Sequence, residues 1–195
     1  MIDPYQKCPT LESSNYIFRQ VTVEDAQDLL ACYSDKESVK LFNSDNCPMD
    51  FYFDDVDELK KLIEFWLMGY SYGGYVRFSI VEKVTNKAIG TIEIFAKKET
   101  NDVYGKVGTL RLDLCSRFEN NEALEEIFVL IENSFGELFG IDAMMTKAVP
   151  YADARVKLLS GSGYVLLPDH TVTKFEDYYI KILGDSKVST IRSNI

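Results

Sequence analysis

The sequence is poor in the residues that build metal sites and hydrolytic triads. Its 195 residues include one histidine, His170, and four cysteines without paired-ligand spacing, which are Cys8, Cys32, Cys47 and Cys115. A structural zinc site needs four cysteine or histidine ligands, and a Ser-His-Asp triad needs a histidine beside the nucleophile. We therefore expect neither kind of site. Cys32 and Cys115 lie in apolar patterns and are interpreted as buried thiols, and His170 as a solvated turn residue.

Long apolar runs and an excess of basic residues are also lacking. No apolar stretch approaches the roughly 20 residues that a membrane span needs, and residues 1–6 lack the basic and apolar parts of a signal peptide. The formal net charge is −10, which leaves no basic stripe for nucleic acid. These absences predict a cytoplasmic protein that binds neither membrane nor nucleic acid. The acidic charge mildly favours a cationic substrate such as an amine.

What the sequence does have is the composition of one packed domain. Hydrophobic residues make up 46% of the chain and aromatic residues 13%, which is typical of an α/β protein large enough to bury a core. No internal repeat and no linker divides residues 1–195. Residues 1–15 contain Pro4 and Pro9 and are predicted to be an irregular lead-in. The polar residues 184–195 are predicted to be a frayed tail.

The first half of the chain predicts a strand, two helices and a hairpin. A strand is expected at 16–22, and Thr22 is a good N-cap for a helix whose first turn carries Glu24 and Asp25. A loop is expected at 43–48 and a second helix at 54–70. Alternating residues at 75–81 and 88–95 predict an antiparallel hairpin, followed by a polar connection at 97–106.

The second half predicts a buried strand joined to a long helix. Apolar residues alternate with polar ones over 108–115, and apolar residues recur at helical spacing from Leu124 to Leu138. A tight turn between strand and helix leaves unpaired N–H groups over the strand end, which favours an anion site. A strand at 142–149, a helix at 152–160, and strands at 164–167 and 173–183 are expected to follow.

This order of elements resembles the GNAT superfamily of N-acetyltransferases, in the branch that includes ribosomal-protein acetyltransferases. The motifs that carry the resemblance are Glu122-Ala-Leu124, Phe135-x-x-Leu-Phe-Gly140 and Lys157-Leu-Leu-x-x-x-Gly-Tyr164. The resemblance covers roughly residues 16–183. It implies an α/β GNAT fold, with a mixed, mostly antiparallel sheet of six to seven strands flanked by about four helices.

The resemblance also implies acetyl-CoA as the acyl donor, held in a gap between two central strands. The backbone of Leu112 and Leu114 would pair with the pantetheine arm, and the turn after Cys115 would hold the pyrophosphate. The family writes this turn with glycines, which let backbone amides close on phosphate, whereas here it is Ser116-Arg-Phe-Glu-Asn-Asn121. The cofactor-binding candidates outside the strand are Arg117, Asn120, Asn121 and Arg155. Arg155 is alternatively a solvated helix residue.

Two carboxylates are the candidates for the catalytic base. Glu93 and Asp113 lie on central strands, on the face opposite the Leu/Ile side. The alternative is that they pair across strands with Arg111 or Arg77. The tyrosine with which the family often protonates the leaving thiolate is replaced by Leu159, which leaves Tyr151 and Tyr164 as weaker candidates for the acid.

The resemblance therefore implies an N-acetyltransferase that transfers an acetyl group from acetyl-CoA to a primary amine by direct attack on the thioester. The alternative is a GNAT-fold module that has lost catalysis and serves in binding or regulation. A gap with Arg117 and Arg155 directed into it favours the enzyme, and a gap filled by Phe118 favours the module. Small-molecule and peptide amines both remain open as acceptors. GNAT domains often dimerise, so a homodimer is also an open expectation.

Overall fold

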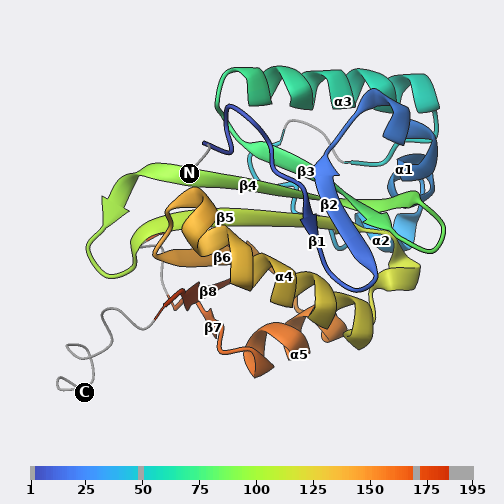
Figure 1. Cartoon of the computed structure of the whole chain (residues 1–195). Helices are drawn as coiled ribbons and strands as arrows, with labels where there is room; N and C mark the ends of the chain where they lie inside the picture. The colour runs from blue at the N-terminus through green and yellow to red at the C-terminus, as the bar shows by residue number, and fades with distance from the viewer. Residues whose placement is uncertain (1–2, 48–50, 169–171, 185–195) are drawn as a thin grey trace.

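The computed structural model describes residues 3–47, 51–168 and 172–184, which form one eight-stranded sheet with helices on both faces (Figure 1). The strand order is β1-β2-β3-β4-β5-β6-β8-β7. Strands β5 and β6 run parallel, and the other neighbours run antiparallel. The expected α/β class and mixed, mostly antiparallel sheet are confirmed. His170 and residues 185–195 of the predicted tail lie outside the described residues.

The elements follow the predicted order with shifted boundaries. The first half contains β1 (Leu11–Glu12), β2 (Tyr16–Gln20), α1 (Ala26–Tyr33), α2 (Lys36–Val39), α3 (Val56–Ser71) and β3 (Val76–Glu82). The second half contains β4 (Lys87–Asn101), β5 (Gly105–Leu114), α4 (Asn121–Phe139), β6 (Ala143–Lys147), α5 (Asp153–Gly161), β7 (Val165–Leu166) and β8 (Tyr178–Ile182). Short 3-10 turns at Val23–Asp25 and Ser116–Phe118 precede α1 and α4.

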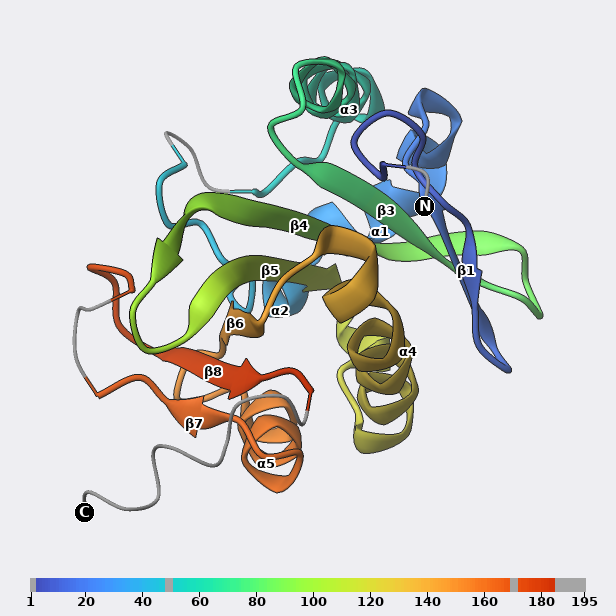
Figure 2. The ribbon, with the colours of Figure 1, turned by 60° about the vertical axis from the view of Figure 1, so that its left-hand side comes forward.

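The two faces of the sheet are covered differently. One face packs its alternating apolar residues against α4, which contributes Leu124, Ile127, Ile131 and Phe135 to the larger core. Helices α1 and α3 cover the opposite face (Figure 2) and form a second core with Leu29, Leu59 and Ile63. Between this second core and the strands lies a layer of buried polar side chains, which are Arg77, Ser79, Thr91, Glu93 and Asp113.

Strand β5 extends beyond the end of its pairing with the parallel strand β6. Its pairing with β6 begins at Val107 and ends where Leu110 faces Thr146, whereas β5 continues to Leu114. The last four residues, 111–114, pair with β4 on the other side. Gly90 permits the close approach at the end of this pairing, because a Cβ there would lie 2.3 Å from the backbone oxygen of Asp113. Residues 111–114 of β5 are therefore paired with β4 on one side but not with β6 on the other, where the two parallel strands splay apart.

The structure corrects three sequence predictions about regular structure. The sheet has eight strands where six to seven were expected, partly because β1 forms within the predicted lead-in. That lead-in packs on the fold, since Tyr5 accepts a hydrogen bond from the Ala96 amide (3.1 Å) and contacts the Phe139 ring. The predicted polar connection at 97–106 is mostly strand, because β4 and β5 extend into a hairpin that turns at residues 102–104.

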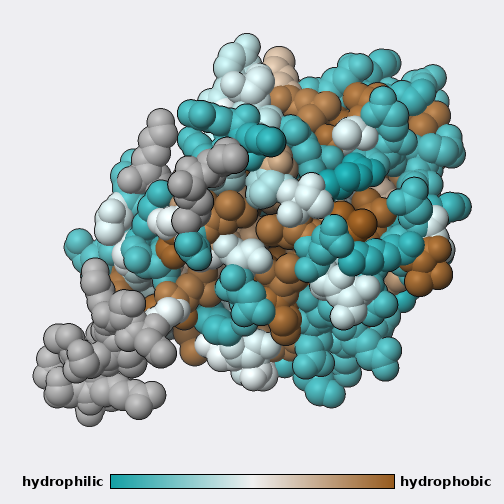
Figure 3. All heavy atoms as spheres, viewed as in Figure 1, coloured by the Kyte–Doolittle hydropathy of each residue, from teal (hydrophilic) through white to brown (hydrophobic). Residues whose placement is uncertain are grey.

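The surface agrees with the sequence composition. Figure 3 shows hydrophilic residues over much of one face, with hydrophobic residues gathered near its centre and beside α3. On α3 itself, Phe65 is 58% exposed and Met68 is 48% exposed. No helix in the described part of the chain is both long enough and apolar enough to span a membrane.

Candidate active site

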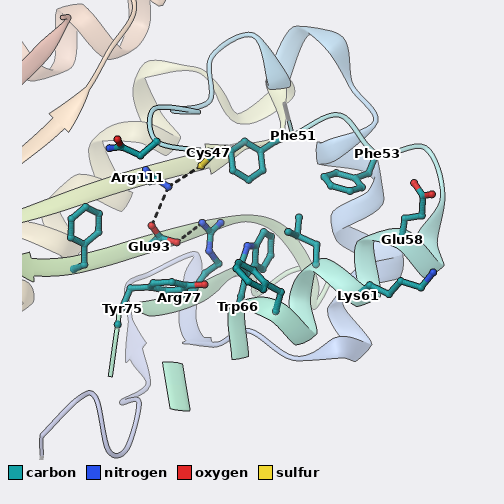
Figure 4. Close-up of a pocket in the computed structure, with 15 residues that line it drawn as sticks. Cys47, Phe51, Phe53, Glu58, Lys61, Trp66, Tyr75, Arg77, Glu93 and Arg111 are labelled. Carbon is teal, nitrogen blue, oxygen red and sulfur yellow. Dashed lines mark hydrogen bonds and ion pairs between the residues drawn. The ribbon is translucent and has the colours of Figure 1, made fainter. Parts of the chain in front are cut away.

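A cavity of about 720 Å³ opens on the face of the sheet covered by α3 (Figure 4). Its base is formed by Arg77 of β3, Glu93 of β4 and Arg111 of β5. Its walls come from α3, from the segments before and after that helix, and from β4. They are mostly aromatic or aliphatic and consist of Cys47, Phe51, Phe53, Leu62, Phe65, Trp66, Tyr75 and Phe95, with Asn46, Glu58 and Lys61 adding polar groups.

Arg77 is the centre of the buried polar layer at the base of this cavity. Its guanidinium donates to Glu93 (Nη2–Oε2, 2.6 Å) and to Asp113 (Nη1–Oδ2, 3.0 Å). Although burial by itself lowers the pKa of Arg77, the charge of Glu93 and further acidic neighbours raise it above the ordinary value, so the side chain stays charged. The guanidinium carbon lies 4.0 Å from the centre of the Trp66 ring, a cation–π contact between two residues that both line the cavity.

Asp113 is held from three sides beneath the cavity. Besides Arg77, it accepts a hydrogen bond from the Tyr33 hydroxyl (2.7 Å), and Thr91 lies 3.5 Å away. Burial and the neighbouring Asp113 charge raise the pKa of Tyr33, so this phenol remains a donor. Asp113 is not among the residues that line the cavity. Its geometry is that of a group that fixes Arg77 and Tyr33.

Glu93, in contrast, lies at the base of the cavity itself. Its Oε2 accepts from Arg77, and its Oε1 is 3.5 Å from Nη1 of Arg111. The cross-strand pairing anticipated as the alternative is thus present for both carboxylates. β4 places Glu93 opposite both Arg77 and Arg111, and Asp113 pairs with Arg77 across β4. The predicted catalytic roles of Glu93 and Asp113 stay predictions, and only Glu93 is positioned to meet a molecule in the cavity.

The segment before residue 48 forms one side of the cavity through contacts that the sequence did not signal. Arg111 donates to the backbone oxygen of Asp45 (2.6 Å) and contacts the Cys47 sulfur (3.4 Å). Lys147 of β6 pairs with the Asp45 carboxylate (2.9 Å). The loop composition of residues 43–48 predicted the irregular structure of the described residues 43–47 but not these partners, which lie far along the chain. The contacts fix the segment over the point where β5 and β6 separate.

The donor side of the sheet begins where β5 leaves β6. Leu112 and Leu114 point their side chains into the α4 core, so their backbone is the part available at the splayed edge. The following turn is already tied to α2. The amide of Ser116 donates to Ser38 Oγ (2.7 Å), and the Ser116 hydroxyl donates to Asp35. These bonds position the turn and occupy one of its amides.

A second cavity of about 330 Å³ lies between α2, the Ser116–Phe118 turn and the start of α5. Glu37, Lys40, Glu119 and Asp153 line it, together with Ser116, Tyr151 and small residues of α5. Arg155 does not extend free into this space. It is buried and ion-paired with Glu119, its Nε lying 3.0 Å from Oε2, and it also donates to the backbone oxygen of Leu41 (3.1 Å).

The remaining donor-side candidates lie around the turn. Arg117 is exposed, with its guanidinium carbon 4.7 Å from the centre of the Phe118 ring. Asn120 is the N-cap of α4 and accepts from the Ala123 amide (3.1 Å), and Asn121 is the exposed first residue of that helix. Phe118 packs edge-on against Tyr16 of β2 and does not line the second cavity. The roles assigned to these residues remain predictions.

The two tyrosines considered as acids lie in different surroundings. Tyr164 is buried against Phe128 of α4, and burial raises its pKa well above the ordinary value. Tyr151 is exposed at the second cavity and donates to the backbone oxygen of Lys40 (2.9 Å). Of the two, Tyr151 lines the cavity that also contains Ser116 of the turn after β5.

Solved structures of GNAT acetyltransferases share this fold. The ribosomal-protein-S5-alanine acetyltransferase from Vibrio fischeri superposes with a TM-score of 0.64 at 17% identity, over 91% of this chain and 98% of that one. A GNAT-family acetyltransferase from Bacillus anthracis gives 0.64 at 12% identity, over 89% and 98%. RimL, a ribosomal alpha-N-protein acetyltransferase solved in complex with coenzyme A, gives 0.67 at 12% identity, over 90% and 98%.

Sequence comparison alone gives a shorter match. An uncharacterized N-acetyltransferase, YoaA of Bacillus subtilis, is 27% identical over 88 residues. The matched segment spans 45% of this chain and 46% of the length of the Bacillus protein. No protein-family model matches the sequence.

Proposed function

We propose that this chain, which has the fold of the GNAT N-acetyltransferases, transfers an acetyl group from acetyl-CoA to a primary amine. The proposal places the donor at the splayed edge of β5 and the acceptor in the 720 Å³ cavity. It makes the protein an acyltransferase of the cytoplasm and treats its donor and acceptor as separate ligands that meet at Arg111.

One observation carries the proposal. Arg111 is the first residue of β5 beyond the last pair with β6, and its side chain lines the large cavity. The splayed backbone and the cavity therefore meet at one residue. A donor paired with residues 111–114 would present its acyl end next to Glu93 and Arg111, where an acceptor amine could reach it.

The residues of the proposed donor site fit the extended arm of acetyl-CoA and its phosphates to different degrees. The backbone of Leu112 and Leu114 offers hydrogen-bonding groups to an extended arm, as an unpaired strand edge does. At the turn, Arg117 is exposed and free to pair with phosphate, with Asn120 and Asn121 beside it. Arg155 already binds Glu119, so it contributes charge to phosphate only in exchange for that pair. When bound, acetyl-CoA supplies an acetyl group activated as a thioester.

Glu93 is the residue placed to handle the acceptor amine. Arg77 fixes Oε2, which leaves Oε1 directed to the cavity base to accept a hydrogen bond, and then a proton, from the amine. In the balanced reaction the nitrogen bonds to the acetyl carbon, the carbon–sulfur bond breaks, and the released sulfur takes up a proton. Asp113 positions Arg77 and through it Glu93.

The test is an acetyl-transfer assay that follows CoA release and acetylated product by mass spectrometry over a panel of amines. Glu93→Gln should lower kcat by at least about 100-fold, whereas Glu58→Gln, at the cavity wall, should change it less than about threefold. Arg117→Ala should raise the KM for acetyl-CoA, and Lys157→Ala, which removes an exposed charge on α5, should not. Acetyl-CoA binding without transfer to any amine would favour the alternative of a binding module.

A further inference from the structure

The cavity wall is unusually rich in aromatic rings. Six rings line it, from Phe51, Phe53, Phe65, Trp66, Tyr75 and Phe95, with Leu62 adding an aliphatic surface. A volume of about 720 Å³ is within the range of small-molecule sites. Such a wall favours an occupant whose body is apolar, because burying apolar surface against it is favourable, and gives no advantage to a hydrated polar chain.

The charged groups in and beneath the cavity are balanced, in contrast to the net negative charge of the chain. Glu58 and Glu93 line the cavity together with Lys61, Arg77 and Arg111, and Asp113, which does not line it, pairs with Arg77. The lining alone therefore carries two acidic and three basic groups, and a polyamine or another multiply charged cation would meet more like charges than opposite ones there. With Asp113 included, the balance favours an occupant without net charge.

The ion pair at the cavity base is loosely made and has unused hydrogen-bonding capacity. Oε1 of Glu93 is 3.5 Å from Nη1 of Arg111, beyond a normal charge-assisted hydrogen bond. Nε of Arg111 is buried and has no hydrogen-bond partner among the described residues. The Glu93 side chain is 5% exposed and that of Arg111 is 12% exposed. A buried pair with an unused acceptor and an unused donor is complementary to a ligand that brings one donor and one acceptor.

From these three features we infer that the acceptor is a free α-amino acid with an apolar, aromatic or branched side chain. The amino group binds Oε1 of Glu93, the carboxylate binds the Arg111 guanidinium, and the side chain packs among the rings. A zwitterion keeps the charge balance of the cavity. This inference rests on the proposed function for the amine's fate, because acetylation occurs at the nitrogen held by Glu93, but the binding itself needs no acetyl-CoA.

The test measures binding by calorimetry in the absence of acetyl-CoA, with four probes that differ by one group. L-phenylalanine carries all three features, phenethylamine lacks the carboxylate, 3-phenylpropionate lacks the amine, and glycine lacks the side chain. L-phenylalanine should bind at least about tenfold tighter than each of the other three. Equal binding of phenethylamine or glycine would overturn the inference, as would tighter binding of putrescine or of L-phenylalaninamide, a mimic of a peptide N-terminus.

Substitutions in the cavity test each proposed contact with the amino acid separately. Arg111→Met should remove the preference for L-phenylalanine over phenethylamine, and Glu93→Gln the preference over 3-phenylpropionate. Since both residues are buried, Phe65→Ser provides an independent test at an exposed position. It should weaken L-phenylalanine binding by at least about fivefold, while Met68→Ser on the same helix should not. Unchanged binding in Phe65→Ser would place the ligand elsewhere and refute the inference.

The outcome also separates this inference from the proposed function. Binding of L-phenylalanine without any acetyl transfer would support the assigned ligand and refute the enzyme. Acetylation of other amines, with no binding of L-phenylalanine at millimolar concentration, would support the enzyme and refute the assigned ligand.

Discussion

Arg77 should be the side chain whose loss destabilises the fold most among the charged residues of the site. Its side chain is 2% exposed, and its two carboxylate partners, Glu93 and Asp113, are 5% and 3% exposed. Arg77→Met keeps most of the side-chain volume but leaves two carboxylates buried without their common cation. Breaking a buried ion pair in this way costs about 3–5 kcal/mol. We expect the free energy of unfolding to fall by about that amount.

The assay is urea unfolding followed by circular dichroism, with the wild type and Arg77→Met measured at pH 7. Lys83→Met is the matched control, because Lys83 and Glu12 form an ion pair with side chains 31% and 59% exposed, and exposed pairs contribute only about 0–1 kcal/mol.

A second change locates the cause of the destabilisation. Adding Glu93→Gln and Asp113→Asn to Arg77→Met removes the stranded charges and should recover at least about 1 kcal/mol, because neutral groups cost less to bury than unpaired ions. An Arg77→Met loss below about 1 kcal/mol would refute the reasoning. So would a triple variant less stable than the single one, since the buried charges could not then be the source of the loss.

Three further results are expected. Although burial by itself raises the pKa of Asp25, hydrogen bonds led by that from Arg19 lower it. Asp25→Asn should therefore lower the free energy of unfolding by about 1–3 kcal/mol at pH 7 and by progressively less as pH falls below about 4. Urea unfolding measures this, and an equal loss at pH 3 would contradict it. Gly90→Ala should destabilise by about 1–3 kcal/mol, since its Cβ would lie 2.3 Å from a backbone oxygen, whereas Gly161→Ala, in open space, should be neutral or stabilising. Burial raises the pKa of Cys8 to about 12, so alkylation at pH 8, mapped by mass spectrometry, should be far slower at Cys8 in the native than in the unfolded chain; equal rates would place Cys8 at the surface.

The elements that the sequence predicted well are those with strong local periodicity. The alternation over 108–115 and the apolar repeat from Leu124 to Leu138 correspond to β5 and α4, because each face of these elements packs on one partner. The two-residue strand β1 had no such signal. It exists because Leu11 and Glu12 lie beside β2 in the folded chain, which is a tertiary effect.

Only the part of the site that lies on neighbouring strands close together in the sequence could be predicted. Alternation correctly put Glu93 and Asp113 on one face with Arg111 and Arg77. The strand register then places Glu93 opposite both arginines, whereas Asp113 lies opposite Thr91 and reaches Arg77 across β4. Contacts made by distant segments were not predictable. Tyr33 reaches Asp113 across 80 positions of the chain.

The donor side shows the same limit. The missing glycines of the turn were visible in the sequence, but the pairing of Glu119 with Arg155, 36 positions further on, was not. Whether an arginine near a phosphate site is free or already paired depends here on how the turn before α4 meets α5. No spacing rule within either segment contains that information.

Calorimetric titration with acetyl-CoA, using CoA as the comparison ligand, tests the central proposal most directly. The proposal predicts micromolar binding of acetyl-CoA that Arg117→Ala weakens by about tenfold or more and that Lys157→Ala leaves unchanged. No detectable heat at millimolar acetyl-CoA, from a protein shown to be folded by circular dichroism, would contradict the proposed donor site and with it the assignment as an acetyltransferase.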